Sequence, residues 1–174
     1  MIGFKYKPIG YSDRLIFLKH HFSPVRSLML YLYKTVRWEK MVNEKTYIML
    51  KPDAVKRRLI GEIVSRIEKK GYQITQAKLM TLDKKVIAEH YAHLLHKPFY
   101  PNLEAYMTSG PVFGMVVEGE NVIAGMRQLM GPTNVYEALP GTIRGDYANN
   151  TTENIIHGSD CKEAATIEIK RFFG

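Results

Sequence analysis

Cysteine is nearly absent from this chain of 174 residues, and its scarcity excludes several kinds of site. The single cysteine, Cys161, allows neither an internal disulfide framework nor a zinc site made of several cysteines. A metal ion that the chemistry requires must therefore arrive with a substrate. Low cysteine content also fits a reducing compartment, and we expect a cytoplasmic protein.

Long apolar runs and the common nucleotide-binding motifs are missing as well. The longest apolar stretch of the first 40 residues, 28–33, is far shorter than the roughly 20 residues that a membrane span needs, so we expect no membrane span. The sequence contains no G-x-x-x-x-G-K-S/T, G-x-G-x-x-G or H-E-x-x-H motif and no paired C-x-x-C. A P-loop kinase is therefore excluded, and any phosphoryl chemistry must use another cradle.

Positive charge is concentrated at the N-terminus. Residues 1–40 contain eight lysines and arginines against two acidic residues, out of a net charge of +8. The remainder is close to neutral, so we expect no specific nucleic-acid binding. We interpret 1–40 as a leader, either disordered or an over-extended start, and 41–174 as the folded domain. A mitochondrial-type transit segment and an arm that contacts a partner or membrane surface are the alternatives for the leader.

Residues 41–174 alternate between strand and helix signals. Asp160 with Glu163 predicts a capping box at the start of a final helix. The order is close to βαββαβ, which predicts an α/β (α+β) sandwich of the ferredoxin-like type with a four-stranded antiparallel sheet. Strands are predicted at 46–50, 72–82, 112–118 and 154–157, and helices near 60–70, 84–95, 103–109, 120–130 and after 160.

A long irregular segment precedes the last predicted strand. Residues 131–153 are rich in glycine, proline and asparagine and show little periodic pattern. Structureless loops longer than about 12–15 residues are uncommon and are usually functional. Arg127, Thr133 and Arg144 flank this loop or lie within it, and two guanidinium groups with a hydroxyl suit a diphosphate. Each of them alone is more often a solvated side chain.

The sequence HGSD at 157–160 is predicted at a strand-to-helix turn. Free backbone N–H groups and the helix dipole favour an anion at such a turn. His157 can carry a covalent intermediate if another group orients its ring, but a structural histidine explains the tetrapeptide equally well. Lys51 follows the first strand, where it is either a cation for a transferring phosphate or, with Pro52 and Asp53, only a strand end and helix cap.

Six short motifs are distributed along the folded domain: KPD at 51–53, EHY at 89–91, KPFY at 97–100, SGPV at 109–112, PGTIRGD at 140–146 and NIIHGSD at 154–160. Any one of these motifs is weak alone, but the last two, in this order and spacing, are highly specific. With these motifs the chain resembles the nucleoside diphosphate kinase family over residues 44–174. The resemblance favours the functional interpretation of His157 over the structural one.

The resemblance implies a role for each candidate residue. His157 matches the phosphorylated histidine of the family, and Ser159 with Glu168 matches the pair that orients its ring. The other matches are substrate contacts: Lys51 and Tyr91 at the γ-phosphate, Arg127, Thr133 and Arg144 at the β-phosphate, Lys51 and Asn154 at the ribose, and Phe99 and Leu103 at the base.

The implied reaction is a ping-pong transfer. A nucleoside triphosphate, carried with Mg²⁺, gives its γ-phosphoryl group to His157, and a second nucleoside diphosphate then takes the group. The resemblance further implies broad base and sugar tolerance, with ATP, other NTPs and NDPs and their deoxy forms as substrates and maintenance of nucleotide pools as the role. It also implies a homo-oligomer, either a hexamer or a tetramer, with no metal ligand supplied by the protein.

Three positions depart from the family pattern. Thr151 stands where an aliphatic residue is common beside the base, Val135 where proline is frequent, and Cys161 where serine is common. Two other classes of function remain open at this point. One is an RNA-binding sheet, which residues 112–116 resemble faintly but without the usual aromatic set. The other is a catalytically silent regulator with the same fold.

Overall fold

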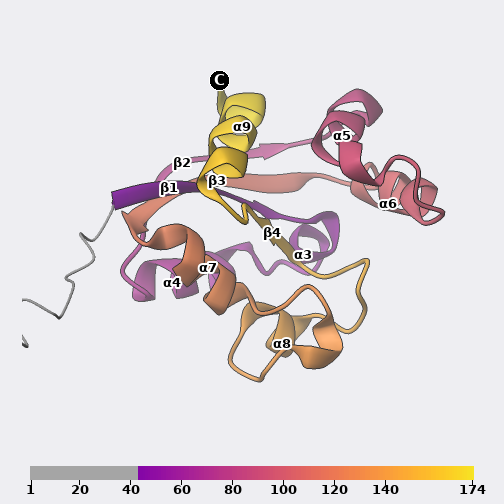
Figure 1. The fold of residues 1–174 in the computed structure, drawn as a ribbon. Helices are drawn as coiled ribbons and strands as arrows, with labels where there is room; N and C mark the ends of the chain where they lie inside the picture. Colours follow the sequence, from indigo (N-terminus) through magenta and orange to yellow (C-terminus); the bar gives the residue numbers. More distant parts are fainter. Residues whose placement is uncertain (1–42) are drawn as a thin grey trace, which may run out of the picture. The chain divides into compact units, whose positions relative to one another are not determined.

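The computed structural model describes residues 43–174 of the chain (Figure 1). The predicted leader, 1–40, and the domain boundary near residue 41 lie outside the described residues. Within the described part, no helix is both long enough and apolar enough to cross a membrane.

Four strands form a single antiparallel sheet. Their order across the sheet, β2-β3-β1-β4, is that of a ferredoxin-like α+β sandwich, which confirms the predicted fold class. The strands are β1 (Asn43–Leu50), β2 (Gln73–Met80), β3 (Val112–Glu120) and β4 (Ile156–Gly158).

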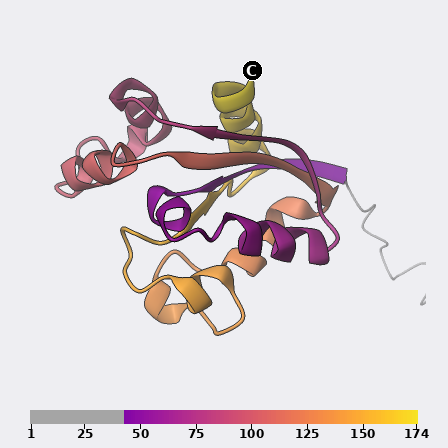
Figure 2. The same cartoon turned by 180° about the vertical axis from the view of Figure 1, so that it is seen from behind.

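Helices cover both faces of this sheet, as Figures 1 and 2 show from opposite sides. Two short 3₁₀ turns, at Ala92–Leu94 and Val135–Glu137, connect some of them. The helices are α3 (Pro52–Lys56), α4 (Ile60–Lys69), α5 (Lys84–His90), α6 (Tyr100–Met107), α7 (Val122–Met130), α8 (Ile143–Tyr147) and α9 (Lys162–Phe173).

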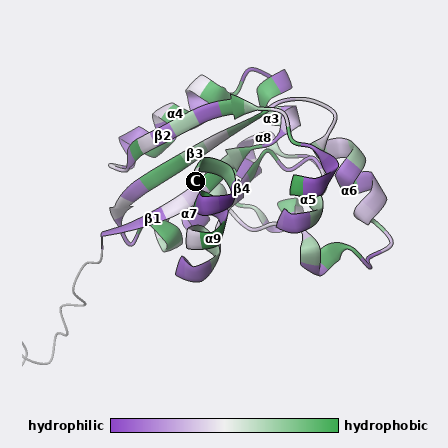
Figure 3. Cartoon of the chain, turned by 90° about the horizontal axis from the view of Figure 1, so that it is seen from above, coloured by the Kyte–Doolittle hydropathy of each residue, from purple (hydrophilic) through white to green (hydrophobic). Residues whose placement is uncertain are grey.

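Strand β1 is buried on both of its faces. Ile48 and Leu50 belong to one apolar cluster, which α4 and α7 complete. Tyr47 and Met49 belong to a second cluster, formed with α5, α6 and Phe172 of α9. Because alternate side chains of a strand point to opposite faces, a strand between two cores is a continuous apolar run. Hydrophobic residues also run along β3, the neighbouring strand (Figure 3).

The predicted capping box at Asp160 is wrong. Helix α9 has Cys161 as its N-cap residue, and the Cys161 sulfur accepts a hydrogen bond from the backbone N–H three residues on, at 3.4 Å. The reason lies in the sheet: the backbone N–H of Ser159 donates to the carbonyl of Tyr47 at 3.1 Å. This bond keeps the chain extended past β4, so the helix starts later than the sequence pattern indicates.

The long segment before β4 holds two short elements that the sequence did not indicate. They are the 3₁₀ turn Val135–Glu137 and helix α8. Thr142 caps α8, because its hydroxyl oxygen accepts a hydrogen bond from the backbone N–H of Gly145 at 3.0 Å. A helix of five residues is shorter than the window of roughly 11–18 residues in which helical periodicity is recognisable.

Candidate functional site

Strand β4 places His157 beside strand β1. His157 pairs with Met49, and paired side chains lie on the same face of a sheet, so His157 points to the face that α9 covers. The adjacent Gly158 faces the other way, where a Cβ atom would lie 2.8 Å from Met130 Sδ and 2.9 Å from Ile48 Cδ1. The close approach of α7 therefore explains why a glycine follows the histidine.

Two side chains hold the His157 ring. Its Nε2 atom lies 3.1 Å from both carboxylate oxygens of Glu168, and the Ser159 hydroxyl donates to the same carboxylate at 2.6 Å. An imidazole that donates its Nε2 proton to a carboxylate keeps a free electron pair on Nδ1. The His157 side chain is 22% exposed, so the ring is accessible from solvent.

The Glu168 carboxylate is held in its charged form. Burial acts to raise its pKa, but hydrogen bonds from His157 and Ser159, with the charge of His157, outweigh burial and lower the pKa below its ordinary value. A charged carboxylate at this place stabilises positive charge on the imidazole. The arrangement therefore suits a histidine that becomes positively charged or covalently modified during a reaction.

Lys51 and Asn154 form the second part of the site. Both are buried, and Lys51 Nζ donates to Asn154 Oδ1 at 2.7 Å. Asn154 in turn donates through Nδ2 to the carbonyl of Thr151 at 2.9 Å. Burial, assisted by the charge of Arg144, lowers the pKa of Lys51 to about 8, with Asp53 acting in the opposite direction. Among residues 43–174, the ammonium group therefore has no charged hydrogen-bond partner.

The backbone between Asn154 and His157 is strained. Ile155 has a φ of +71°, a left-handed conformation that is a genuine outlier for a β-branched residue. A hydrogen bond from Ile156 N to Asn154 O at 2.8 Å closes a three-residue turn around it. The turn is fastened from outside, because Lys51 N donates to Ile155 O at 2.8 Å.

Asp53 is a site residue whose role the sequence did not reveal. Its sequence position suggested a helix N-cap, but the N-cap of α3 is Lys51. The Asp53 carboxylate instead accepts hydrogen bonds from Ile155 N at 3.2 Å and from the Tyr106 hydroxyl. It therefore pins the strained turn to α6. The only signal in the sequence was its place in the KPD motif.

Arg144 ties the long loop to strand β4. Its guanidinium group donates to the carbonyls of Gly131 at 2.7 Å, Ile156 at 2.7 Å and Asn154 at 3.4 Å. The residue is buried, and burial, together with the charge of the exposed Arg127, lowers its pKa to about 10. Two of the predicted phosphate-binding cations, Arg127 and Arg144, are therefore close enough to repel each other.

Tyr91 lies near both Glu168 and Arg144, whose charges act on its pKa. It is buried, and its hydroxyl has no hydrogen-bond partner among the described residues. Burial, together with the charge of Glu168, raises its pKa, while Arg144 lowers it. The phenol is therefore neutral and has a hydroxyl proton to donate to a ligand.

Three candidates remain, namely Phe99, Leu103 and Thr133. Phe99, which would otherwise be taken for a core residue, is 52% exposed. Leu103 is buried in the cluster formed by α5, α6 and α9, and Thr133 is exposed. Within residues 43–174, no hydrogen bond or aromatic contact joins these three side chains to His157.

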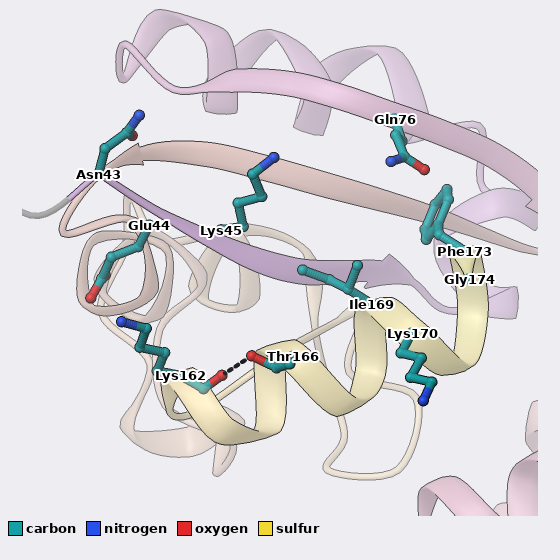
Figure 4. Close-up of a pocket in the computed structure, with 10 residues that line it drawn as sticks. All are labelled: Asn43, Glu44, Lys45, Gln76, Lys162, Thr166, Ile169, Lys170, Phe173 and Gly174. Carbon is teal, nitrogen blue, oxygen red and sulfur yellow. Dashed lines mark hydrogen bonds between the residues drawn. The ribbon is translucent and has the colours of Figure 1, made fainter.

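A separate hollow of about 580 Å³ is lined by residues of β1, β2 and α9 and by Gly174 (Figure 4). It is open and contains several lysines, and none of its lining residues is a candidate site residue. We therefore separate it from the site around His157. It is lined by Asn43, Glu44, Lys45, Gln76, Lys162, Thr166, Ile169, Lys170, Phe173 and Gly174.

Comparison with known proteins shows the family of this chain. The family model described as nucleoside diphosphate kinase matches residues 44–174. The nucleoside diphosphate kinases of Listeria monocytogenes serotype 4b and Brevibacillus brevis are each 55% identical over 130 residues, which span 75% of this chain and 88% of each relative. A solved nucleoside diphosphate kinase from Halobacterium salinarum, in complex with CDP, is 48% identical, with a TM-score of 0.74 over 76% of this chain and 88% of that one.

These matches place the chain among the kinases, which transfer phosphoryl groups. The chain belongs to the nucleoside diphosphate kinase family. It accordingly has nucleoside diphosphate kinase activity on nucleoside diphosphates and triphosphates, which confirms the predicted family, enzyme class and activity. Members of this family generally use nucleotides that carry Mg²⁺.

Replacing Arg144 tests its role as a structural link. In Arg144→Lys, a single ammonium group cannot reach carbonyls on both the loop and β4, so buried acceptors lose their donors. We expect the free energy of unfolding, measured by urea denaturation, to fall by roughly 2–4 kcal/mol. The control is Arg57→Lys, an exposed arginine with one bond to Tyr147 O, which should change it by less than about 1 kcal/mol. Equal changes in both variants would contradict the assignment.

Proposed function

We propose that the chain transfers phosphoryl groups by a ping-pong mechanism in which Nδ1 of His157 is the acceptor. The observation that carries this proposal is the contact between His157 Nε2 and both oxygens of Glu168 at 3.1 Å. With Nε2 committed as a donor, Nδ1 has the free electron pair. Ser159 supports the arrangement, because its hydroxyl fixes the carboxylate that fixes the ring.

In the first half-reaction, the Nδ1 electron pair attacks the γ-phosphorus of a nucleoside triphosphate. The bond between the γ-phosphorus and the bridging oxygen breaks, and that oxygen leaves with the electron pair as part of the diphosphate product. The imidazole keeps its Nε2 proton and gains positive charge, which the charged Glu168 stabilises. No proton has to leave the ring during the transfer.

The second half-reaction is the reverse with another nucleotide. A terminal oxygen of an incoming nucleoside diphosphate attacks the phosphorus, and the phosphorus–nitrogen bond returns its electron pair to Nδ1. Because both half-reactions use the same groups, the site needs to recognise only the diphosphate part and the sugar. Phosphoryl transfer of this kind depends mainly on positioning and charge neutralisation.

Positive and hydroxyl groups around His157 would supply that neutralisation. Lys51 and Tyr91 are assigned to the γ-phosphate, and Arg127, Thr133 and Arg144 to the β-phosphate. Lys51 and Asn154 are both assigned to the ribose. Lys51 suits its role because, within the part of the chain that the structure describes, its ammonium group hydrogen-bonds only to the neutral Asn154. Arg144 uses three hydrogen bonds to carbonyls, and a guanidinium group has five N–H donors, so two remain for phosphate oxygens.

We assign Mg²⁺ to the nucleotide and not to the protein. Among residues 43–174, the two carboxylates packed within the site already accept hydrogen bonds, Asp53 from Ile155 N and Tyr106, and Glu168 from His157 and Ser159. Phosphate oxygens are hard ligands that Mg²⁺ prefers. The ion would therefore enter and leave as part of the substrate.

Broad base tolerance follows from the proposed base site. Phe99 is largely exposed and is free to stack on a base, while the buried Leu103 would support the wall behind it. Stacking on an aromatic face does not read the edges of a base. We therefore infer that the chain uses ATP, other NTPs and NDPs and their deoxy forms, and maintains nucleotide pools.

We also infer a homo-oligomer, a hexamer or a tetramer, in the cytoplasm. Large apolar side chains are exposed on β2 and on the loop before α8, namely Leu79, Tyr136 and Leu139. Exposed apolar groups of this kind commonly mark contacts between subunits. The exposed thiol of Cys161 fits a reducing compartment.

Labelling with γ-labelled ATP tests the acceptor. We expect the protein to acquire a label that is stable in alkali and labile in acid, as a phosphorus–nitrogen bond requires, and that passes to added GDP or dCDP. His157→Gln should acquire none. His96→Gln, which changes an exposed histidine, should be labelled like the original chain.

Two outcomes of this labelling would contradict the proposal. A label that remains in His157→Gln would place the acceptor elsewhere. A label on His157 that never passes to a diphosphate would favour a regulator with this fold over a pool-maintaining kinase.

The pH dependence of kcat/KM tests Lys51. This ratio reports ionisations of the free enzyme, where the pKa of Lys51 is about 8. Because the charged ammonium is the form that binds phosphate, we expect kcat/KM to fall about tenfold per pH unit above that value. Lys51→Met should lose this limb and be slower by roughly 10²–10³ at neutral pH. The exposed Lys56→Met should keep the limb, and a flat profile in the original chain would contradict the role.

A further inference from the structure

His90 packs against the proposed phosphoryl acceptor, but the mechanism proposed above gives it no role. It ends helix α5, and its side chain is 2% exposed. Its ring meets the His157 ring edge-on, with centroids 4.6 Å apart and planes at 78°. Tyr91 and Phe172 enclose it further, at 4.5 Å and 5.3 Å between centroids. The packing fixes His90 against the unit formed by His157 and Glu168.

The His90 ring is neutral. Burial is the main cause that lowers its pKa to about 3, the charges of His157, Arg171 and Lys51 lower it further, and Glu168 opposes them. Near pH 7 the ring therefore carries one proton, on either Nδ1 or Nε2. The titratable groups that face it are Lys51 after β1, Tyr47 on β1, Tyr91 after α5, His157 on β4, and Glu168 and Arg171 on α9.

Arg171 selects one of these two tautomers. Its Nη1 atom lies 3.4 Å from His90 Nδ1. A guanidinium group only donates hydrogen bonds, so Nδ1 must be the acceptor and the proton must reside on Nε2. That Nε2 atom is buried without a partner among residues 43–174, so nothing else on the ring favours this tautomer.

The other tautomer would compete with His157 for Glu168. His90 Nδ1 lies 3.8 Å from Oε1 of Glu168, on the same carboxylate that binds His157 Nε2. A proton on His90 Nδ1 would form a hydrogen bond to Oε1 after a small rotation. The carboxylate would then be shared between two imidazoles and would stabilise charge on His157 less well.

A metal site is the alternative for this cluster. His90, His157 and Glu168 each offer a ligand atom, and these atoms lie within 4.8 Å of one another. A transition metal would need the Nδ1 electron pair of His90, which faces the positive guanidinium of Arg171, and the Glu168 oxygens, which already accept bonds from His157 and Ser159. The hydrogen-bonded arrangement is therefore the better account.

We propose that Arg171 and His90 are positioning residues, in which Arg171 holds His90 as its Nε2–H tautomer and thereby leaves the Glu168 carboxylate to His157. The inference rests on the proposed role of His157 as phosphoryl acceptor. His90 packs against the His157 ring, but neither His90 nor Arg171 is assigned a contact with substrate. Their proposed effect on the reaction comes through the charge and direction of Glu168.

Nitrogen NMR of the full-length protein tests the tautomer directly. In protein labelled with ¹⁵N-histidine, long-range ¹H–¹⁵N spectra distinguish the protonated nitrogen of each ring, and loss of one signal set in His90→Gln assigns His90. We expect Nε2–H at pH 7 in the original chain and a shift toward Nδ1–H in Arg171→Met. The control is Lys170→Met, which removes the exposed cation next to Arg171 on α9 and should change nothing.

Kinetics then separates positioning from a merely structural role. Arg171→Met should lower kcat for loading of the phosphoryl group roughly tenfold, as loss of an outer partner of a functional histidine does, and leave KM unchanged. Arg171→Lys keeps one donor and should recover part of the rate. Lys170→Met should match the original chain in both constants.

Several results would overturn the inference. The first is that His90 is protonated on Nδ1 in the original chain. The second is that its tautomer does not change in Arg171→Met, and the third is that the tautomer changes while kcat does not. A His90 spectrum that changes on addition of EDTA would instead indicate a bound metal. Because the spectra are recorded without nucleotide, they decide about His90 even if labelling at His157 fails, so failure of the inference and of the proposed function remain distinguishable.

Discussion

The hydrogen bond between His157 and Glu168 is the interaction on which the rest of the site depends. It commits one ring nitrogen as a donor and so leaves the other, the proposed nucleophile, with a free electron pair of defined direction. The bond joins β4 to α9, and it therefore requires the helix to be docked on the sheet. Phe172 of α9 stacks on Tyr47 of β1, with ring centroids 4.6 Å apart and planes at 7°. Packing of the second apolar cluster and the proposed chemistry at His157 therefore both require α9 to be docked on the sheet.

The segment that leads into β4 is held mainly by hydrogen bonds to its backbone groups. The positive φ of Ile155 costs on the order of 1–3 kcal/mol, and such strain persists only where the surroundings over-determine it. Here Lys51 N, the Asp53 carboxylate and the Arg144 guanidinium all bind this turn or its neighbours. The strained turn begins at Asn154, whose side-chain oxygen accepts a hydrogen bond from the Lys51 ammonium group.

The fold and the family could be predicted from the sequence, because apolar periodicity and a specific motif are local signals. Other features depend on contacts between segments that are far apart in the sequence. No local sequence pattern reveals these contacts. Asp160 has the sequence of an N-cap, yet a sheet hydrogen bond from the neighbouring residue postpones the helix. Asp53 serves Ile155, far along the chain, and His90 meets Arg171 only after α5 and α9 pack together.

The identity of the phosphorylated nitrogen tests the central claim most directly. The phosphoenzyme, prepared with ¹⁵N-histidine and a nucleoside triphosphate, would be observed by ³¹P and ¹⁵N NMR, in which coupling identifies the nitrogen bonded to phosphorus. We expect phosphorus on Nδ1 of His157, with Nε2 still protonated and hydrogen-bonded to Glu168. Phosphorus on Nε2 would contradict it, because that nitrogen is the one the carboxylate holds.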